Sequence, residues 1–139
     1  MEIKQNDTPA TILRALALQN RGADNFFRGP QLEGLLRDRG VEPPERARKS
    51  ELYDLLAEHC SLEELERFGG MGLPSLDWQR RFGVTGAQVR KLARLGVMRR
   101  TGMERVRRYG KYINCPLYSV IDFFRLTDEE VRKALEVGK

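Results

Sequence analysis

Residues 75–97, SLDWQRRFGVTGAQVRKLARLGV, contain two short helical patterns separated by a turn that is centred on glycine. Ser75 can cap a first helix that continues to Phe82, because a serine hydroxyl accepts a hydrogen bond from a first-turn N–H. Gly83 suits the positive φ that a tight turn between two helices requires. Thr85 can cap the next helix in the same way as Ser75. This order of elements predicts a helix-turn-helix.

The second of these helices, residues 86–95, separates apolar from basic side chains. Its inward stripe consists of Val89, Leu92, Ala93 and Leu95. The opposite face carries long donors behind the small residues at the N-terminal tip, and these donors are Gln88, Arg90, Lys91 and Arg94. Small residues at the tip permit close approach to a duplex, while the long donors reach base edges and phosphates. We therefore expect residues 86–95 to be a recognition helix in the major groove.

A basic segment follows this helix. Residues 97–100 and 105–108 are two short segments around a stretch that contains glycine, which predicts a hairpin turning at residues 101–104. We expect this basic wing, residues 97–108, to lie along the phosphate backbone or to place an arginine in the minor groove. Tyr109 and Tyr112 are expected to pack against the wing rather than to stack on bases. The full set of expected DNA contacts is Thr85, Gln88, Arg90, Lys91, Arg94, Arg99, Arg100, Arg105, Arg107, Arg108 and Lys111.

The distribution of charge supports a polyanionic partner. Residues 1–73 hold 10 basic and 13 acidic side chains, whereas residues 74–139 hold 15 basic and 7 acidic ones. Within residues 74–115 there are 11 basic side chains and only two acidic ones, Asp77 and Glu104. So concentrated a positive charge repels itself unless something negative offsets it, and this favours nucleic acid as the partner.

The order of elements in residues 75–135 resembles the winged helix-turn-helix domain of the MerR and excisionase type. The resemblance depends on FGVT at 82–85, on VRKLARLGV at 89–97 and on YSVID at 118–122. It implies sequence-directed binding of double-stranded DNA, with the second helix in the major groove and the hairpin on the backbone. No long coiled-coil helix follows residue 135, so a small phage or mobile-element protein fits better than an effector-responsive MerR regulator.

The first half of the chain has helical patterns throughout. A helix beginning at Pro9 is expected to end at residues 21–25, and further helices are expected over 30–39 and 47–59. Ser61 to Glu64 form a capping box for a short fourth helix that ends near Phe68. Residues 69–74, GGMGLP, then resemble a linker, and the charge balance changes sign there. We therefore divide the chain into two domains, 1–73 and 74–139.

Residues 27–58 resemble a SAP domain, a small helix-extended-helix module. The matching residues are Leu32, Leu35, Leu36, Gly40, Val41, Lys49, Glu51, Leu52, Leu55 and Leu56. The resemblance implies a second DNA contact through Arg46, Arg48 and Lys49. The module is acidic overall, so a helical protein-binding module is an equally good interpretation. The fold class predicted for the whole chain is thus mainly α, with a helical first domain and a winged helix-turn-helix second domain that contains a short β-hairpin.

Several classes of protein are not supported by the sequence. It contains no glycine-rich phosphate loop and no nucleophile paired with a histidine, so we expect no enzyme and no cofactor. The single histidine, His59, stands beside Cys60, and one histidine with two distant cysteines does not supply a zinc site, so no metal is expected. No apolar run suits a membrane span, and the N-terminus lacks the apolar segment of a secretory signal. The two unpaired cysteines fit a reducing cytoplasm, so we expect a cytoplasmic protein associated with the nucleoid.

The sequence therefore predicts a small DNA-binding protein that acts as a transcriptional regulator or as a phage or mobile-element factor. The main alternative is an adaptor that binds the transcription machinery through its helical first half. RNA binding ranks lower, because few aromatic side chains are interleaved with the basic helix. The target sequence, the effect on transcription and the oligomeric state are left open by the sequence.

Overall fold

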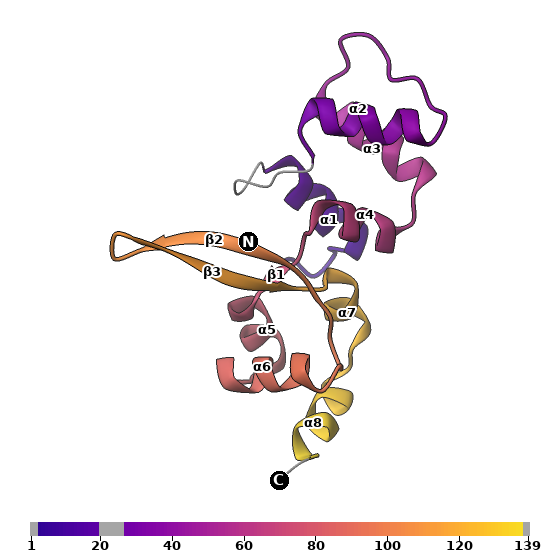
Figure 1. Cartoon of the computed structure of the whole chain (residues 1–139). Coiled ribbons are helices and arrows are strands. Elements are labelled where there is room, and N and C mark those ends of the chain that lie inside the picture. Colours follow the sequence, from indigo (N-terminus) through magenta and orange to yellow (C-terminus); the bar gives the residue numbers. More distant parts are fainter. Residues whose placement is uncertain (1–2, 20–26, 138–139) are drawn as a thin grey trace.

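The computed structural model describes residues 3–19 and 27–137 of the chain. In this part of the chain, eight helices surround a small antiparallel sheet of three strands (Figure 1). The prediction of a mainly α fold is confirmed. In Figure 1, the helices of the two halves lie on opposite sides of the sheet, and a long hairpin extends beyond both.

The N-terminal half, residues 1–73, contributes four helices, and their bounds are α1 Pro9–Leu18, α2 Gly29–Asp38, α3 Lys49–His59 and α4 Leu62–Gly69. Proline occupies the first turn of both α1 and α2, where its missing N–H breaks no intrahelical hydrogen bond. The capping box at the start of α4 is confirmed, since the Ser61 side chain accepts a hydrogen bond from the Glu64 backbone N–H. The predicted end of the first helix at residues 21–25 lies outside the described residues.

The C-terminal half, residues 74–139, begins within a short strand, and its elements are β1 Leu73–Pro74, α5 Ser75–Phe82, α6 Gly86–Arg94, β2 Arg100–Arg108, β3 Lys111–Tyr118, α7 Val120–Arg125 and α8 Asp128–Glu136. Gly83 adopts the predicted positive φ of 64° between α5 and α6. The prediction that Ser75 caps α5 is wrong. Pro74 is the N-cap, and the Ser75 hydroxyl instead accepts a hydrogen bond from Gln79 one turn later.

The sheet has the strand order β1-β3-β2, with both pairs antiparallel. The predicted hairpin turn at residues 101–104 is wrong, because these residues belong to β2. The chain turns instead at Tyr109 and Gly110, where φ is 51° and 75°. Two consecutive residues with positive φ suit the right-handed twist of a two-residue hairpin. The sequence did not indicate this turn, because a tyrosine, rather than asparagine or glycine, occupies its first position.

Trp78 is the centre of the core of the C-terminal half and is completely buried. Its ring stacks on Phe82 with centroids 5.5 Å apart, and it meets Phe123 and Tyr118 edge to face at 5.4 and 6.4 Å. These aromatic contacts hold α5, α7 and β3 together. Helix α5 is thereby anchored on α7 and on the sheet.

The glycine-rich segment at 69–74, which has the composition of a linker, is packed inside the molecule. Met71, Gly72 and Leu73 are buried, and Leu73 pairs with Tyr118 in the sheet. The buried apolar residues of both halves form one continuous cluster, and α1 and α4 both contact α7. The composition of this segment reflects close packing of backbones, because glycine is also the residue that lets two chains approach each other.

None of the helices in residues 3–19 and 27–137 is both long enough and apolar enough to pass through a lipid bilayer.

Candidate nucleic-acid interface

Helix α6 begins with a complete capping box. The Thr85 side chain accepts a hydrogen bond from the Gln88 backbone N–H, and the Gln88 side-chain oxygen accepts one from the Thr85 N–H at 2.9 Å. Val89 and Leu92 are fully buried, as predicted. Leu95 was expected to face inward, but it is 43% exposed because α6 ends at Arg94 and Leu95 is only its C-cap.

The exposed face of α6 is narrower than the predicted one. Ala87, Arg90 and Arg94 are exposed, and their i, i+3 and i+7 spacing places them in one stripe along the helix. Gln88 is partly buried and its side chain serves the capping box described above. Lys91 lies on the flank toward α8, where its ammonium group donates a hydrogen bond to the Leu135 carbonyl oxygen at 3.0 Å. The predicted contacts of α6 therefore separate into two free arginines and three side chains with structural partners.

The projecting hairpin of β2 and β3, which we call the wing, carries most of the remaining basic side chains. Arg108 lies directly opposite Lys111, next to the turn. Like charges at opposed positions of an antiparallel pair destabilise the free hairpin, and a bound polyanion removes this repulsion. Arg105, Arg107, Arg108 and Lys111 are all exposed.

The two tyrosines of the wing differ in their surroundings. Arg105 and Arg107 lie over the Tyr112 ring, with 4.4 and 6.0 Å from the guanidinium carbon to the ring centroid. This cation–π contact agrees with the prediction that Tyr112 packs on the wing. The same prediction is wrong for Tyr109, which sits at the turn and is 102% exposed.

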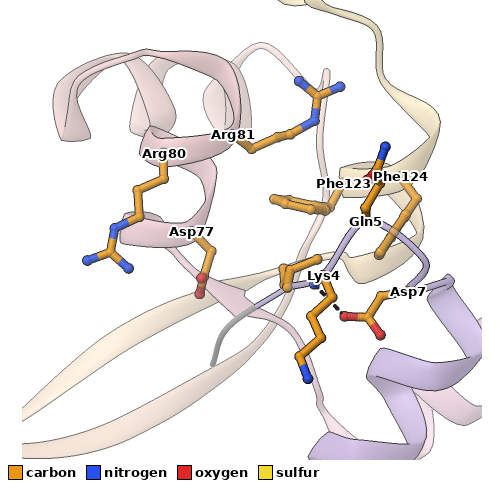
Figure 2. Close-up of a pocket in the computed structure, with 9 residues that line it drawn as sticks. Lys4, Gln5, Asp7, Asp77, Arg80, Arg81, Phe123 and Phe124 are labelled. Atoms are coloured by element: carbon orange, nitrogen blue, oxygen red, sulfur yellow. Dashed lines mark hydrogen bonds between the residues drawn. The ribbon is translucent and has the colours of Figure 1, made fainter.

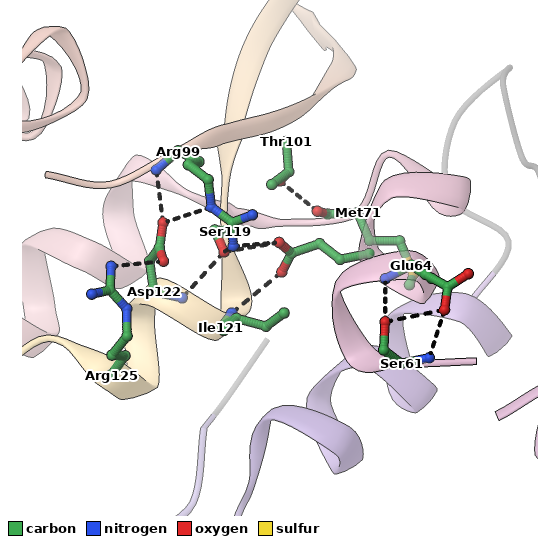
Figure 3. Close-up of polar contacts among 10 residues, drawn as sticks. Ser61, Glu64, Met71, Arg99, Thr101, Ser119, Ile121, Asp122 and Arg125 are labelled. Carbon is green, nitrogen blue, oxygen red and sulfur yellow. Dashed lines mark hydrogen bonds and ion pairs between the residues drawn. The ribbon is translucent and has the colours of Figure 1, made fainter. Parts of the chain in front are cut away.

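Arg99, at the base of the wing, is occupied by carboxylates. Its guanidinium group forms ion pairs with Asp122 at 3.2 Å and with Glu66 at 3.4 Å (Figure 3). Both carboxylates are buried, whereas the Arg99 side chain is 54% exposed. Of the predicted contacts, Arg99 is thus the one whose charge is already neutralised within the chain.

Tyr118, a buried residue of β3, is influenced by the charges of arginines on both α6 and β2. Burial raises the pKa of Tyr118, and the positive charges of Arg100 and Arg90 lower that pKa in part. Both guanidinium groups are therefore close enough to act on the same phenol. The exposed stripe of α6 and the base of the wing thus each carry an arginine whose charge reaches Tyr118, which the sequence did not indicate.

A second group of basic side chains lies at the start of α3. Arg46 is exposed and has a φ of 55°, and the exposed Arg48 is the N-cap of the helix. Burial and the neighbouring charge of Arg28 lower the pKa of Lys49, the first residue of α3. Arg28 is the N-cap of α2, so the charge at the start of α2 acts on the first residue of α3. The structure thus adds Arg28, which the sequence did not indicate, to the cations whose charge acts at the start of α3.

An open cavity of about 490 Å³ lies between the N-terminal segment, α5 and α7 (Figure 2). Phe123 and Phe124 line it, and its rim includes Lys4, Asp7, Asp77 and Arg80. Both basic and acidic side chains line it, so the cavity is not a purely basic site. No group of three or more His, Cys, Asp or Glu side chains within the described residues is arranged to hold a metal ion. Burial raises the pKa of the Cys60 thiol, which reduces its reactivity as a nucleophile.

Sequence reasoning missed Glu66, Thr101 and the turn at 109–110. Glu66 follows Glu63 and Glu64 in the sequence and resembles a solvated acidic residue, yet it is only 1% exposed.

Comparison of the chain with models of protein families, with curated proteins and with solved structures found no match.

Proposed function

We propose that this protein binds double-stranded DNA through α6 and the wing. In this proposal, residues 74–139 are the winged helix-turn-helix domain and residues 1–73 are an accessory helical module. Arg90 and Arg94 enter the major groove, and the wing follows the phosphate backbone with Arg100, Arg105, Arg107, Arg108 and Lys111.

The observation that carries the proposal is the large share of basic side chains without a carboxylate partner. Of the 11 basic side chains in residues 74–115, salt bridges among the described residues engage only Arg81 and Arg99. The cations without a carboxylate partner among the described residues occur on α6 and along the wing to its turn, and the charges of Arg90 and Arg100 both act on Tyr118. An arrangement that leaves so many like charges side by side favours a polyanion over a neutral partner.

The geometry of α6 favours a duplex over a single strand. Its exposed stripe has a small residue, Ala87, near the N-terminal tip and two long arginines behind it, which suits insertion into a groove about as wide as a helix. Single-strand binding uses aromatic platforms on which bases stack. Arg105 lies over one face of the Tyr112 ring and Tyr109 stands alone at the turn, so the described surface of the wing offers no row of stacking platforms.

The salt dependence of binding tests the proposal. We expect fluorescence anisotropy with a random duplex to give a slope of log affinity against log salt of roughly −4 to −6, from about five phosphate contacts. The double variant Arg107→Ala/Arg108→Ala should reduce the magnitude of this slope by about 2. Arg37→Ala, on α2, is a control that removes one positive charge outside this surface and should leave the slope unchanged.

Failure of the full chain to bind any duplex near physiological salt would reject the proposal and favour the adaptor that acts through the N-terminal helices. Tighter binding to single-stranded RNA than to the duplex would also reject it.

A further inference from the structure

Glu66 belongs to α4 of the N-terminal half, but its carboxylate has its partners in the C-terminal half. One carboxylate oxygen accepts hydrogen bonds from the Ser119 hydroxyl at 2.9 Å and from the Arg99 guanidinium at 3.4 Å. The other oxygen accepts one from the backbone N–H of Ile121 at 3.3 Å. Three donors around a side chain that is 1% exposed make a specific link between the two halves.

Arg99, one of these donors, is the residue at which the chain enters the wing (Figure 3). Its backbone N–H donates to Asp122 at 2.8 Å, and its carbonyl oxygen accepts from the Ser119 N–H at 2.8 Å. Its side chain bridges Asp122 and Glu66. Both the backbone and the side chain of the last residue before β2 are therefore fixed.

Strand β2 begins with a β-bulge that contacts the N-terminal half. Arg100 pairs with Tyr118 and Gly102 with Leu117, so Thr101 has no partner in β3. The Thr101 hydroxyl instead donates to the Met71 carbonyl oxygen at 2.5 Å. A Cβ atom on Gly102 would lie 1.8 Å from the carbonyl oxygen of Gly70, so the two backbones are in direct contact. A bulge bends and twists its strand, so whatever fixes the bulge also fixes the direction of the hairpin beyond it.

We infer that the N-terminal half sets the direction of the wing, with Glu66 as the positioning residue and the backbone of Gly70 and Met71 as a support under the bulge. Only the consequence for DNA affinity rests on the proposed function. A buried carboxylate adds little stability beyond what a well-packed apolar side chain provides. The role of Glu66 is therefore to fix the direction of the wing rather than to stabilise the fold. A shift of α4 would therefore change the direction of the wing.

A distance measurement on the full chain tests the direction of the wing without DNA. Spin labels are placed at Tyr109→Cys on the turn and at Leu95→Cys after α6, with Cys60→Ser and Cys115→Ser removing the native thiols. Glu66→Gln keeps the shape but directs an amide NH₂ at one of the donors, so we expect a shifted or broadened distance distribution. Glu64→Gln, on the same helix but paired with Arg39 and Ser61, should leave the distribution unchanged.

An unchanged distribution in a folded Glu66→Gln chain would overturn the inference. Thr101→Val serves as a second probe should Glu66→Gln fail to fold, because it removes only the hydroxyl that bonds to Met71. Thr101→Val should alter the same distance, and an unaltered distance would overturn the inference equally.

Affinity for a duplex gives an independent test, because a general loss of stability and a loss of wing positioning predict different changes in affinity. Glu66→Gln should weaken binding about three- to tenfold in the native chain, but less than twofold after Arg108→Ala/Lys111→Ala has removed the charges of the wing tip. Equal losses in the two backgrounds would overturn the inference. If the native chain binds no duplex, the proposed function fails and the distance measurement alone decides the direction of the wing.

Discussion

Arg90 and Arg94 are adjacent on one face of α6, and neither forms a salt bridge with the described residues. Two cations at i, i+4 repel each other and reduce the stability of the helix by a few tenths of a kcal/mol. On this helix the unfavourable pair stands on the exposed stripe, while the third cation, Lys91, is bonded to α8. The contrast shows that a side chain's position on the helix, rather than its charge alone, decides whether it is free to meet a ligand.

We predict that Arg90→Ala and Arg94→Ala each weaken binding by about 1–3 kcal/mol at a preferred site, because a bidentate contact to guanine is lost. The preferred site is first selected from a random duplex library, and dissociation constants are then measured on that site and on unrelated duplexes. A loss of equal size on every duplex would show that the two arginines contact only phosphates.

Tyr53 gives a prediction on pH dependence in the N-terminal half. Burial, together with the nearby Asp54 carboxylate, raises the pKa of Tyr53 to about 12 from 10.0. The unfolded chain ionises this phenol near its ordinary pKa, whereas the folded chain keeps it neutral. The contribution to stability is therefore complete below about pH 10 and is lost as the pH rises toward 12, by about 2–3 kcal/mol in all.

The measurement for Tyr53 is the free energy of unfolding between pH 9 and 12, in the native chain and in Tyr53→Phe. The free energy of unfolding of the native chain minus that of Tyr53→Phe should decrease with rising pH. A constant difference across this range would contradict the raised pKa.

The turn of the wing is the element whose sequence and conformation agree least. Tyr109 occupies a position with a φ of 51°, which favours asparagine or glycine, and its ring is fully exposed. No packing within the described residues compensates for this conformation. The wing should therefore be the least stable part of the sheet.

We predict that Tyr109→Asn slows hydrogen exchange of the amides of β2 and β3, whereas Gly110→Val accelerates it. A β-branched residue at a φ of 75° costs about 1–2 kcal/mol. Hydrogen exchange of the full chain followed by NMR gives the protection of each amide. Equal exchange in the three proteins would show that the turn does not control the hairpin.

Across the whole molecule, the two halves share one apolar core and one polar cluster. Leu73 pairs with Tyr118, α1 and α4 contact α7, and Glu66 lies buried beside Ser119. Removing the N-terminal half would therefore expose apolar surface and leave Arg99 with one carboxylate fewer. The two predicted domains are physically coupled at the base of the wing.

This coupling predicts a single unfolding transition. In a Cys115→Ser chain, fluorescence of Trp78 reports on the C-terminal half and the reactivity of the Cys60 thiol reports on the N-terminal half, so the two signals should change at the same urea concentration. Glu66→Gln should shift both midpoints together. Two separate transitions in the native chain would show that the halves fold independently.

The local pattern of residues 75–97 by itself determined most of helices α5 and α6 and of the turn between them. Capping at Thr85, the glycine turn at Gly83 and the buried positions Val89 and Leu92 depend only on neighbours within a few residues, so the sequence contains the information needed to predict them. Only the tertiary structure decided which cations are free, because Arg99 is neutralised by Glu66, a residue 33 positions away in the chain. The tertiary structure also decided that residues 69–74 are packed, because a glycine-rich sequence is equally compatible with a flexible linker and with a close contact between backbones. Short-range hydrogen bonds leave a signature in sequence order, whereas contacts between distant segments depend on how the helices and strands meet.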